Sequence, residues 1–238
     1  MDLTNAVTVP PCAKVPLWWH LCEVYLANMS NRSPHIRAAI IGSGGGTNAR
    51  ALCEHASSGT ARYVVGLIIS TKANIGILDV ASQHGVPCRV CDAKDTFDQD
   101  VCAALRDHQI DLVLLAGLMR HISSTTIAAV NGNMLNIHPS LLPRHGGQGM
   151  YGIHVHRAVL SAGEAQTGAT VHVVTDEYDQ GQIIDQQSVD VVHGETAEQL
   201  QERVKALEHR LYPRAVDKFC EMLQTSASSS ESGVKWAF

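Results

Sequence analysis

The chain has 238 residues, of which 45% are hydrophobic and 17% charged, and it carries a formal net charge of −5 with a pI near 6.2. This balance supplies enough apolar side chains for one large globular domain. The acidic charge gives no footprint for nucleic acid, and no apolar run reaches the roughly 18 residues that span a membrane, so we expect neither partner.

The first 35 residues lack a clear hydrophobic period and end in a linker-like run, 29–34. The apolar segment 15–22 is short, contains His20 and follows a single basic residue, Lys14, so it does not match a secretory signal. The seven cysteines of the chain are scattered and odd in number, which favours reduced thiols. We therefore expect residues 1–35 to be an extension or linker of a cytoplasmic protein.

From Ile36 the hydrophobic pattern predicts alternating strands and helices. Residues 63–70 form a nearly continuous apolar run, which is typical of a strand buried on both faces. A glycine-rich turn, 42–48, follows the first strand, and Gly85 is placed to cap the second helix. The strands are expected at 36–41, 63–70, 86–91 and 111–116, and the helices at 49–57, 75–84 and 96–109. This order predicts an α/β fold with a doubly wound, mostly parallel sheet.

The second half of the chain continues the pattern around a glycine-rich loop, 144–151, with the composition of an active-site lid. Thr196 and Gln199 fit a capping box before a long amphipathic helix, which Pro213 should bend or interrupt. We expect helices at 123–130 and 153–162 and strands at 134–137, 169–175 and 183–192, the last of them antiparallel to its neighbour. From Thr225 the chain is rich in serine, so the predicted domain spans 36–224 and a disordered tail spans 225–238.

Two polar side chains stand at the end of the predicted strand 134–137, where His138-Pro139 stops it. Asn136 and His138 are two residues apart and therefore point to the same side. The carboxyl ends of strands are where open α/β sheets bind ligands. Either residue alone is explained equally well as a hydrogen-bonded loop residue.

The glycine-rich turn passes a loose dinucleotide-binding fingerprint, Gly44-x-Gly46-x-x-Ala49. That type of site needs an acid at the end of the second strand, where this chain has Ser70-Thr71-Lys72. NAD is therefore not expected, although Lys72 leaves NADP open. The simpler interpretation is a cradle for a phosphomonoester at a helix N-terminus, with a tight turn that binds nothing as the alternative.

The segment 136–143, Asn-Ile-His-Pro-Ser-Leu-Leu-Pro, resembles the signature of the folate-dependent formyltransferases, and the likeness extends over about 36–222. It implies a Rossmann-like formyltransferase fold. The Pro-Ser-Leu-Leu-Pro form is similar to that of the members that act in purine synthesis. The resemblance thus implies transfer of a formyl group from 10-formyltetrahydrofolate to the amine of glycinamide ribonucleotide, with no metal.

The resemblance also implies catalytic roles for three residues. Asn136 and His138, the latter as a cation, would stabilise the oxyanion that forms on the formyl group. Asp179 would assist proton transfer, because 170–181 is similar to the family segment that ends in a catalytic aspartate. Without the resemblance, the acidic turn 176–179 reads as solvated surface. His172 in the same segment is either a functional residue or a satisfied strand histidine.

The remaining implied contacts concern the two substrates. Gly46, Thr47 and Asn48 would contact the ribonucleotide phosphate. Lys205 and Glu208 would hold its phosphate and ribose hydroxyls respectively, although a surface ion pair is the alternative. The pterin pocket would comprise Leu115, Met119, Arg120, His121, Ile122 and Ile127. His121 stands where the family usually has an aliphatic residue, and His154 and His156 read as lid or surface residues.

Three other functions compete with this one. A formyltetrahydrofolate hydrolase would need an amino-terminal regulatory domain, and a methionyl-tRNA formyltransferase a basic carboxyl-terminal domain, and we expect neither domain here. A non-catalytic module that binds NADP or another nucleotide could use the same glycine-rich turn. The sequence leaves the oligomeric state open between a monomer and a homodimer.

Overall fold

The computed structural model describes residues 35–231, and all structural statements below concern these residues. The chain divides into two units, of which the second begins at Ile36. Apart from His35, the predicted extension 1–35 lies outside the described residues, as do residues 232–238 of the predicted tail. The division of the chain into extension, domain and tail stays a prediction.

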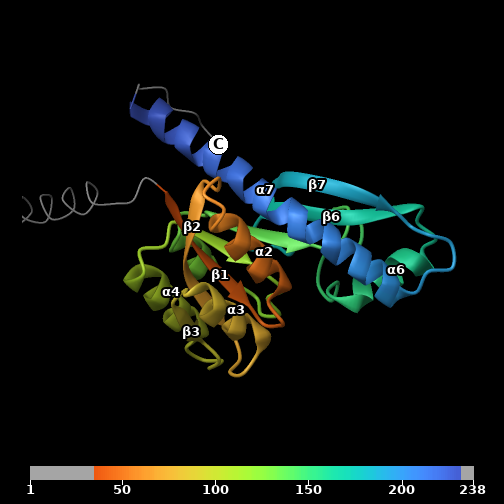
Figure 1. The fold of residues 1–238 in the computed structure, drawn as a ribbon, viewed down its shortest axis with the longest axis horizontal. Helices are drawn as coiled ribbons and strands as arrows, with labels where there is room; N and C mark the ends of the chain where they lie inside the picture. The colour runs from red at the N-terminus through yellow and green to blue at the C-terminus, as the bar shows by residue number, and fades with distance from the viewer. Residues whose placement is uncertain (1–34, 232–238) are drawn as a thin grey trace, which may run out of the picture. The chain divides into compact units, whose positions relative to one another are not determined.

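A seven-stranded sheet forms the centre of the second unit, in the order β3-β2-β1-β4-β5-β6-β7 (Figure 1). The five strands from β3 to β5 are parallel, β6 runs antiparallel to β5, and β7 runs antiparallel to β6. The strands are β1 (Ile36–Gly42), β2 (Tyr63–Ser70), β3 (Cys88–Val90), β4 (Leu112–Leu115), β5 (Met134–His138), β6 (Gln166–Val173) and β7 (Ile183–Asp190). The predicted mostly parallel α/β sheet with a late antiparallel strand is confirmed.

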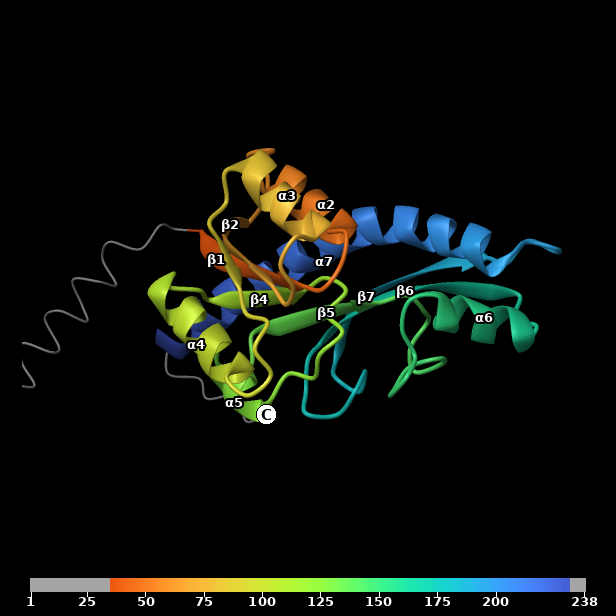
Figure 2. The same ribbon diagram turned by 90° about the horizontal axis from the view of Figure 1, so that it is seen from below.

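Helices cover both faces of this sheet, with α2, α3 and α7 on one face and α4 and α5 on the other (Figure 2). Each face has its own apolar core, and α6 packs against α7. The helices are α2 (Thr47–Ala56), α3 (Gly76–His84), α4 (Phe97–Asp107), α5 (Ser124–Ala128), α6 (Ile153–Ser161) and α7 (Ala197–Glu231). No helix within 35–231 is both long enough and apolar enough to cross a bilayer.

The central strands explain why the sheet forms here. β4 is buried along its whole length, and β2 is buried or half-buried throughout, as a strand covered on both faces must be. The predicted strand 86–91 is shorter in the structure, because β3 lies at the sheet edge and its three side chains are exposed. Gly85 adopts the left-handed conformation that ends α3, as predicted.

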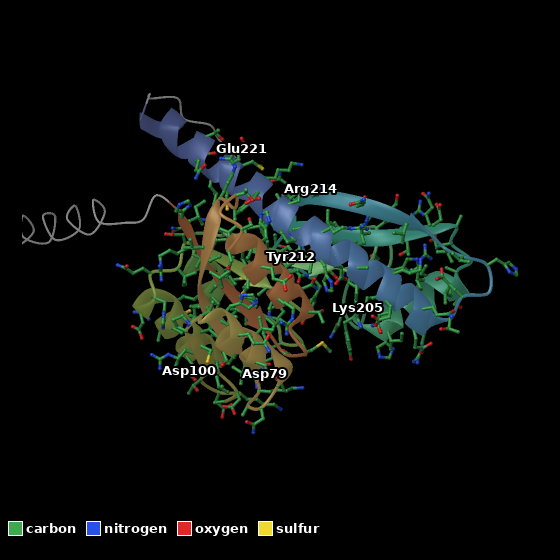
Figure 3. The ribbon with its side chains drawn as sticks, in the orientation of Figure 1. Asp79, Asp100, Lys205, Tyr212, Arg214 and Glu221 are labelled. Carbon is green, nitrogen blue, oxygen red and sulfur yellow. The ribbon has the colours of Figure 1, made fainter. Side chains whose placement is uncertain are left out.

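The long helix α7 carries residues of the site along the sheet (Figure 3). Of the two effects predicted for Pro213, a bend or an interruption, the interruption does not occur, because Leu211, Tyr212 and Ala215 around the proline are fully buried and hold both halves in place. The helix also continues past Thr225, where the disordered tail was predicted to start, and the tail stays a prediction. The Thr225 hydroxyl donates to carbonyls one turn back, so the helix accommodates it and continues to Glu231.

The start of α7 has the predicted capping box. The Thr196 hydroxyl accepts a hydrogen bond from the Gln199 N–H at 3.3 Å, and the Gln199 side chain accepts one from the Thr196 N–H at 2.8 Å. We expect Thr196→Ala to lower the free energy of unfolding by about 1 kcal/mol. Urea unfolding measures this loss, and Thr225→Ala near the other end of α7 is the control with little expected change. Equal stability of the two variants would contradict a role for the cap.

Candidate functional site

A cavity of about 590 Å³ opens where β1, β4 and β5 end. The glycine-rich turn after β1, the loop 147–152 and one face of α7 close its other sides. It is lined by Gly44–Asn48, Ala116–Arg120, Asn136–Pro139, Gly147–Gly152, His156, Tyr178, Asp179, Gln201, Lys205 and Glu208. The three predicted catalytic residues, Asn136, His138 and Asp179, therefore share one cavity although 43 positions separate the first from the last in sequence (179 − 136).

Asn136 and Asp179 are connected through His172, which faces Asn136 from the neighbouring strand β6. The Nδ2 of Asn136 lies 3.2 Å from Nε2 of His172, and that Nε2 lies 3.4 Å from Oδ1 of Asp179. The other ring nitrogen, Nδ1, lies 2.9 Å from the carbonyl oxygen of Val173. Because a carbonyl only accepts, Nδ1 carries a proton, and in the tautomer that leaves Nε2 unprotonated this nitrogen accepts from the Asn136 amide. His172 is thus part of the site and orients this amide.

His138 is buried and both of its ring nitrogens have neighbours. Its Nε2–H donates to the carbonyl of His145 at 2.8 Å, and its Nδ1 lies 3.5 Å from Oδ2 of Asp179. Burial lowers the pKa of His138 below its usual value and outweighs the nearby carboxylate, which acts to raise it. Burial therefore acts against the cationic His138 that the resemblance implies, while the Asp179 carboxylate beside Nδ1 acts in its favour, and the charge of His138 stays a prediction.

Asp179 is held by backbone as well as by the two imidazoles. The N–H of Gly147 donates to its Oδ2 at 2.8 Å, and the residue itself has a positive φ of 56°. Burial acts to raise the pKa of Asp179, but the adjacent imidazoles of His172 and His138 and the hydrogen bond from the Gly147 N–H together lower it below its usual value. At neutral pH this carboxylate is ionised, directed at His138 and fixed by the loop that lines the cavity.

The glycine-rich turn forms the opposite end of the cavity. Gly46 precedes α2 with a positive φ of 77°, and a Cβ at this position would lie 2.8 Å from Cα of Ile77. Only glycine both adopts this positive φ without strain and avoids a close contact between a Cβ and the Ile77 backbone. Gly46, Thr47 and Asn48 line the cavity at the N-terminus of α2, which is the geometry that favours a phosphate group.

Asn48 and Glu208 meet across the cavity wall. The Nδ2 of Asn48 donates to Oε2 of Glu208 at 2.8 Å, while its buried Oδ1 has no hydrogen-bond partner within the described residues. Burial raises the pKa of Glu208 to about 7, against smaller opposing effects of Asn48 and Lys205. The Lys205–Glu208 ion pair, which was the alternative to a substrate-binding role for these residues, does not form; Lys205 donates to Glu202 at 2.7 Å.

His156 lies in the same cavity and is only 1% exposed, so its interpretation as a lid or surface residue is wrong. Burial, with smaller contributions from Lys205 and His138, lowers its pKa to about 4. The reason is its position on α6, where Val155, His156 and Val159 form the buried face. This helical spacing is the signal in the sequence that could have identified it.

A second, smaller cavity of about 90 Å³ adjoins the first and shares Asn136, Tyr178 and Asp179 with it. Four of the six residues predicted for the pterin pocket line it: Leu115, Arg120, His121 and Ile122. Met119 lines the larger cavity instead and is 55% exposed.

Two of the predicted pterin residues differ from expectation. Ile127 packs against the apolar core beneath α4 and α5 and does not line either of the two cavities, and its assignment to the pterin pocket stays a prediction. His121 lies edge-on to Tyr178 with ring centroids 5.2 Å apart, and so forms an aromatic wall where an aliphatic residue was expected.

The Arg120 side chain is held away from the cavity centre. Its guanidinium donates to the carbonyls of Asp92 and Ala93 and lies 4.8 Å from the ring centroid of Phe97. This anchoring fixes the segment 117–122 between the two cavities.

Sequence reasoning did not identify Tyr178 or the Gly147 N–H, since a contact between backbone and a side chain 32 residues away leaves no pattern in the sequence.

The end of β2 bears on the NADP alternative. Ser70 donates to the carbonyl of Lys72 and accepts from its N–H, which closes a local turn. The residues that line the two cavities come from the ends of β1, β4 and β5 and from α7, and Lys72 is not one of them. NADP binding needs a basic residue for the 2′-phosphate, and Lys72, the candidate for this role, does not line either cavity among the described residues.

Comparison with known proteins agrees with this site. A family model described as "Formyl transferase" matches residues 36–216. The chain is 38% identical over 191 residues to a chloroplastic phosphoribosylglycinamide formyltransferase of Arabidopsis thaliana, which covers 78% of this chain and 65% of that protein. It is 40% identical over 185 residues to the trifunctional purine biosynthetic protein adenosine-3 of Bos taurus, covering 76% of this chain and 18% of that one.

Solved structures show the same similarity. Glycinamide ribonucleotide transformylase 1 from Symbiobacterium toebii is 36% identical with a TM-score of 0.74, over 80% of this chain and 90% of that one. Phosphoribosylglycinamide formyltransferase from Brucella melitensis is 39% identical with a TM-score of 0.72, over 78% and 96%. The chain thus spans 65% of the Arabidopsis thaliana relative but nearly the whole of these two crystal structures.

Proposed function

The chain belongs to the formyl transferase family, and we propose that it transfers a formyl group from 10-formyltetrahydrofolate to the amine of glycinamide ribonucleotide in purine synthesis. The observation that carries this proposal is that Asn136, His138 and Asp179 line one cavity together with a phosphate-type turn, and that this cavity adjoins a smaller one. The names of the relatives support the same substrates. The phosphate would lie at Gly46–Asn48 and the pterin in the smaller cavity.

The first step would be attack of the amine nitrogen on the formyl carbon, which places negative charge on the formyl oxygen. Asn136 can donate its second amide N–H to this oxygen, because His172 accepts the first one. His138 donates to the His145 carbonyl in the free protein, so donation to the oxyanion requires either release of that carbonyl or a proton on Nδ1. Donors placed in this way contribute about 10²–10³ in rate each.

The second step requires one proton to leave the amine and one to reach the folate nitrogen as its bond to the formyl carbon breaks. Asp179 is ionised and lies 3.5 Å from Nδ1 of His138. It can stabilise the positive charge that attack creates on the amine and receive its proton. Transfer of that proton to the leaving nitrogen, through His138 or a bridging water, would complete the reaction without net consumption of acid or base.

Glu208 would accept hydrogen bonds from the ribose hydroxyls. We expect Glu208→Gln to weaken glycinamide ribonucleotide binding by roughly 10-fold or more, since a bond to a charged group is worth about 1.5–3 kcal/mol. Isothermal titration measures this change. Glu202→Gln, an exposed acid on the same helix, is the matched control and should bind normally. Normal affinity of the Glu208 variant would remove this residue from the substrate site.

The same variant tests the raised pKa of Glu208. The folded state binds this proton more tightly than the unfolded chain, so the stabilisation is complete below pH 4.5 and is lost as the pH rises through about 7. Between pH 5 and 8 the wild type should lose on the order of 2–3 kcal/mol of its free energy of unfolding through this group. Glu208→Gln lacks the group, so its stability relative to the wild type should rise by that amount over the same pH range. Urea unfolding at both pH values measures it, and a difference between the two proteins that does not depend on pH would contradict the raised pKa.

Ligand titration distinguishes the proposal from its competitors. The proposed enzyme should bind glycinamide ribonucleotide and a folate, whereas a non-catalytic module should bind NADP or another nucleotide and no folate. A hydrolase should bind the folate and consume it without the ribonucleotide.

No group of three His, Cys, Asp or Glu side chains in the described part of the chain has the geometry of a metal site, and independence from metal stays a prediction that a chelator tests.

The compartment and the oligomeric state are separate proposals. The cysteine pattern predicts a cytoplasmic protein, and the Arabidopsis thaliana relative is named as chloroplastic, which makes an organelle the alternative. A fluorescent fusion of the whole chain distinguishes them. Sedimentation distinguishes the predicted monomer from the homodimer.

A further inference from the structure

One buried hydroxyl joins two loops that both line the larger cavity. Ser43, which follows β1 and is 7% exposed, accepts a hydrogen bond from the backbone N–H of Met119 at 3.1 Å. It accepts a second one from the hydroxyl of Thr71 at 2.7 Å. Its own N–H donates to the carbonyl of Gly117 at 3.2 Å. The ends of β1, β2 and β4 therefore meet at this residue.

The two loops have different partners in the proposed reaction. Gly44–Thr47, directly after Ser43, line the end of the cavity that suits a phosphate. Leu118 and Arg120, on either side of Met119, line both the larger and the smaller cavity. The loop that begins at Ser43 supplies the acceptor of the Ser43–Met119 hydrogen bond, and the segment 117–120 supplies its donor. When a ligand orders one of these two loops, the bond therefore also restrains the other.

We propose that Ser43 is a positioning residue that couples the two substrate subsites, so that a phosphate-bearing ligand at the glycine-rich turn strengthens binding of the folate beside segment 117–120, and the reverse. This inference rests on the proposed function for the identity of the two ligands. Ser43 itself does not need to contact either of them. The coupling is reciprocal, because linked equilibria change each other by the same factor.

Two variants separate the coupling from a merely structural role. Ser43→Ala removes the acceptor for both Met119 and Thr71, whereas Thr71→Val removes only the Thr71 bond and leaves the Met119 N–H paired with Ser43. A loss of stability would appear in both variants. A loss of coupling should appear only in Ser43→Ala.

The experiment is isothermal titration of tetrahydrofolate into the whole chain, with and without saturating glycinamide ribonucleotide. In the wild type and in Thr71→Val, the ribonucleotide should strengthen tetrahydrofolate binding by roughly fivefold or more. In Ser43→Ala this factor should fall to about one, with each ligand still bound alone, and Ser43→Thr should restore it.

The outcomes identify which idea fails. Equal coupling in Ser43→Ala and the wild type, or equal loss in Thr71→Val and Ser43→Ala, would overturn the role of Ser43 while leaving the proposed function intact. Independent binding of the two ligands to the wild type would overturn the coupling as well. A wild type that binds neither ligand would instead overturn the proposed function on which the inference rests.

Discussion

Replacing Asp179 by asparagine is expected to lower kcat for formyl transfer by roughly 10³–10⁴-fold, the upper part of the range for a positioned acid or base. Asparagine keeps the shape of the side chain and tolerates the positive φ of 56° at this position, so the fold should remain. The variant loses the negative charge that faces His138 at 3.5 Å and His172 at 3.4 Å. Steady-state kinetics with both substrates saturating measures the effect.

The control for this variant is Asp190→Asn, at the end of β7, where the carboxylate accepts a hydrogen bond from Gln166 outside both cavities. It should retain wild-type turnover. Circular dichroism and the unfolding midpoint check that Asp179→Asn is folded. A decrease in kcat of less than about threefold for Asp179→Asn would be far smaller than the expected loss and would remove this carboxylate from the mechanism.

Replacing Asn136 by alanine is expected to lower kcat by about 10²–10³-fold with little change in either KM, because the amide would donate to an oxygen that is negatively charged only during the reaction. The loss should appear equally in kcat and in kcat/KM. His172 contacts the Asn136 amide and orients it. Replacing His172 by glutamine should therefore cause part of the loss in kcat that Asn136→Ala causes.

Asn133→Ala is the matched control for Asn136→Ala. Asn133 directly precedes the same strand, and its amide donates to the carbonyl of Asp111, away from both cavities. This variant should keep kcat and lose only a little stability. An increase in KM without a decrease in kcat for Asn136→Ala would show that the amide binds the ground state, which is contrary to the proposal.

The local patterns of the sequence predict the sheet and one side of the site. The alternation of a strand places Asn136 and His138 together, and the break at Pro139 places them at a carboxyl end. Glycines 44–46 predict the turn that lines the cavity. These features depend on neighbours in the sequence, so short-range rules are sufficient for them.

The remaining features depend on contacts between distant segments. Composition alone assigns Asp179 to the surface, and only the family resemblance places it in the site. The lowered pKa of His138 follows from its burial in the folded chain. The N–H of Gly147 donates to the Asp179 carboxylate 32 residues away, and the hydroxyl of Ser43 accepts from the Met119 N–H 76 residues away. No spacing rule within one element predicts such contacts.

The errors have similar causes. Pro213 stays within α7 because the buried residues on both sides of it outweigh one lost hydrogen bond. His156 was interpreted as a lid or surface residue, but it lies on the buried face of α6 with Val155 and Val159. In each case tertiary packing, which the sequence pattern does not contain, decides the result.

The most direct test of the proposed function is an assay of the purified chain with glycinamide ribonucleotide and 10-formyltetrahydrofolate, in which tetrahydrofolate and the formylated ribonucleotide are both quantified. We predict that the two products form in equal amounts and only when both substrates are present. Release of formate from the folate at the same rate without the ribonucleotide would contradict the transferase and identify a hydrolase instead.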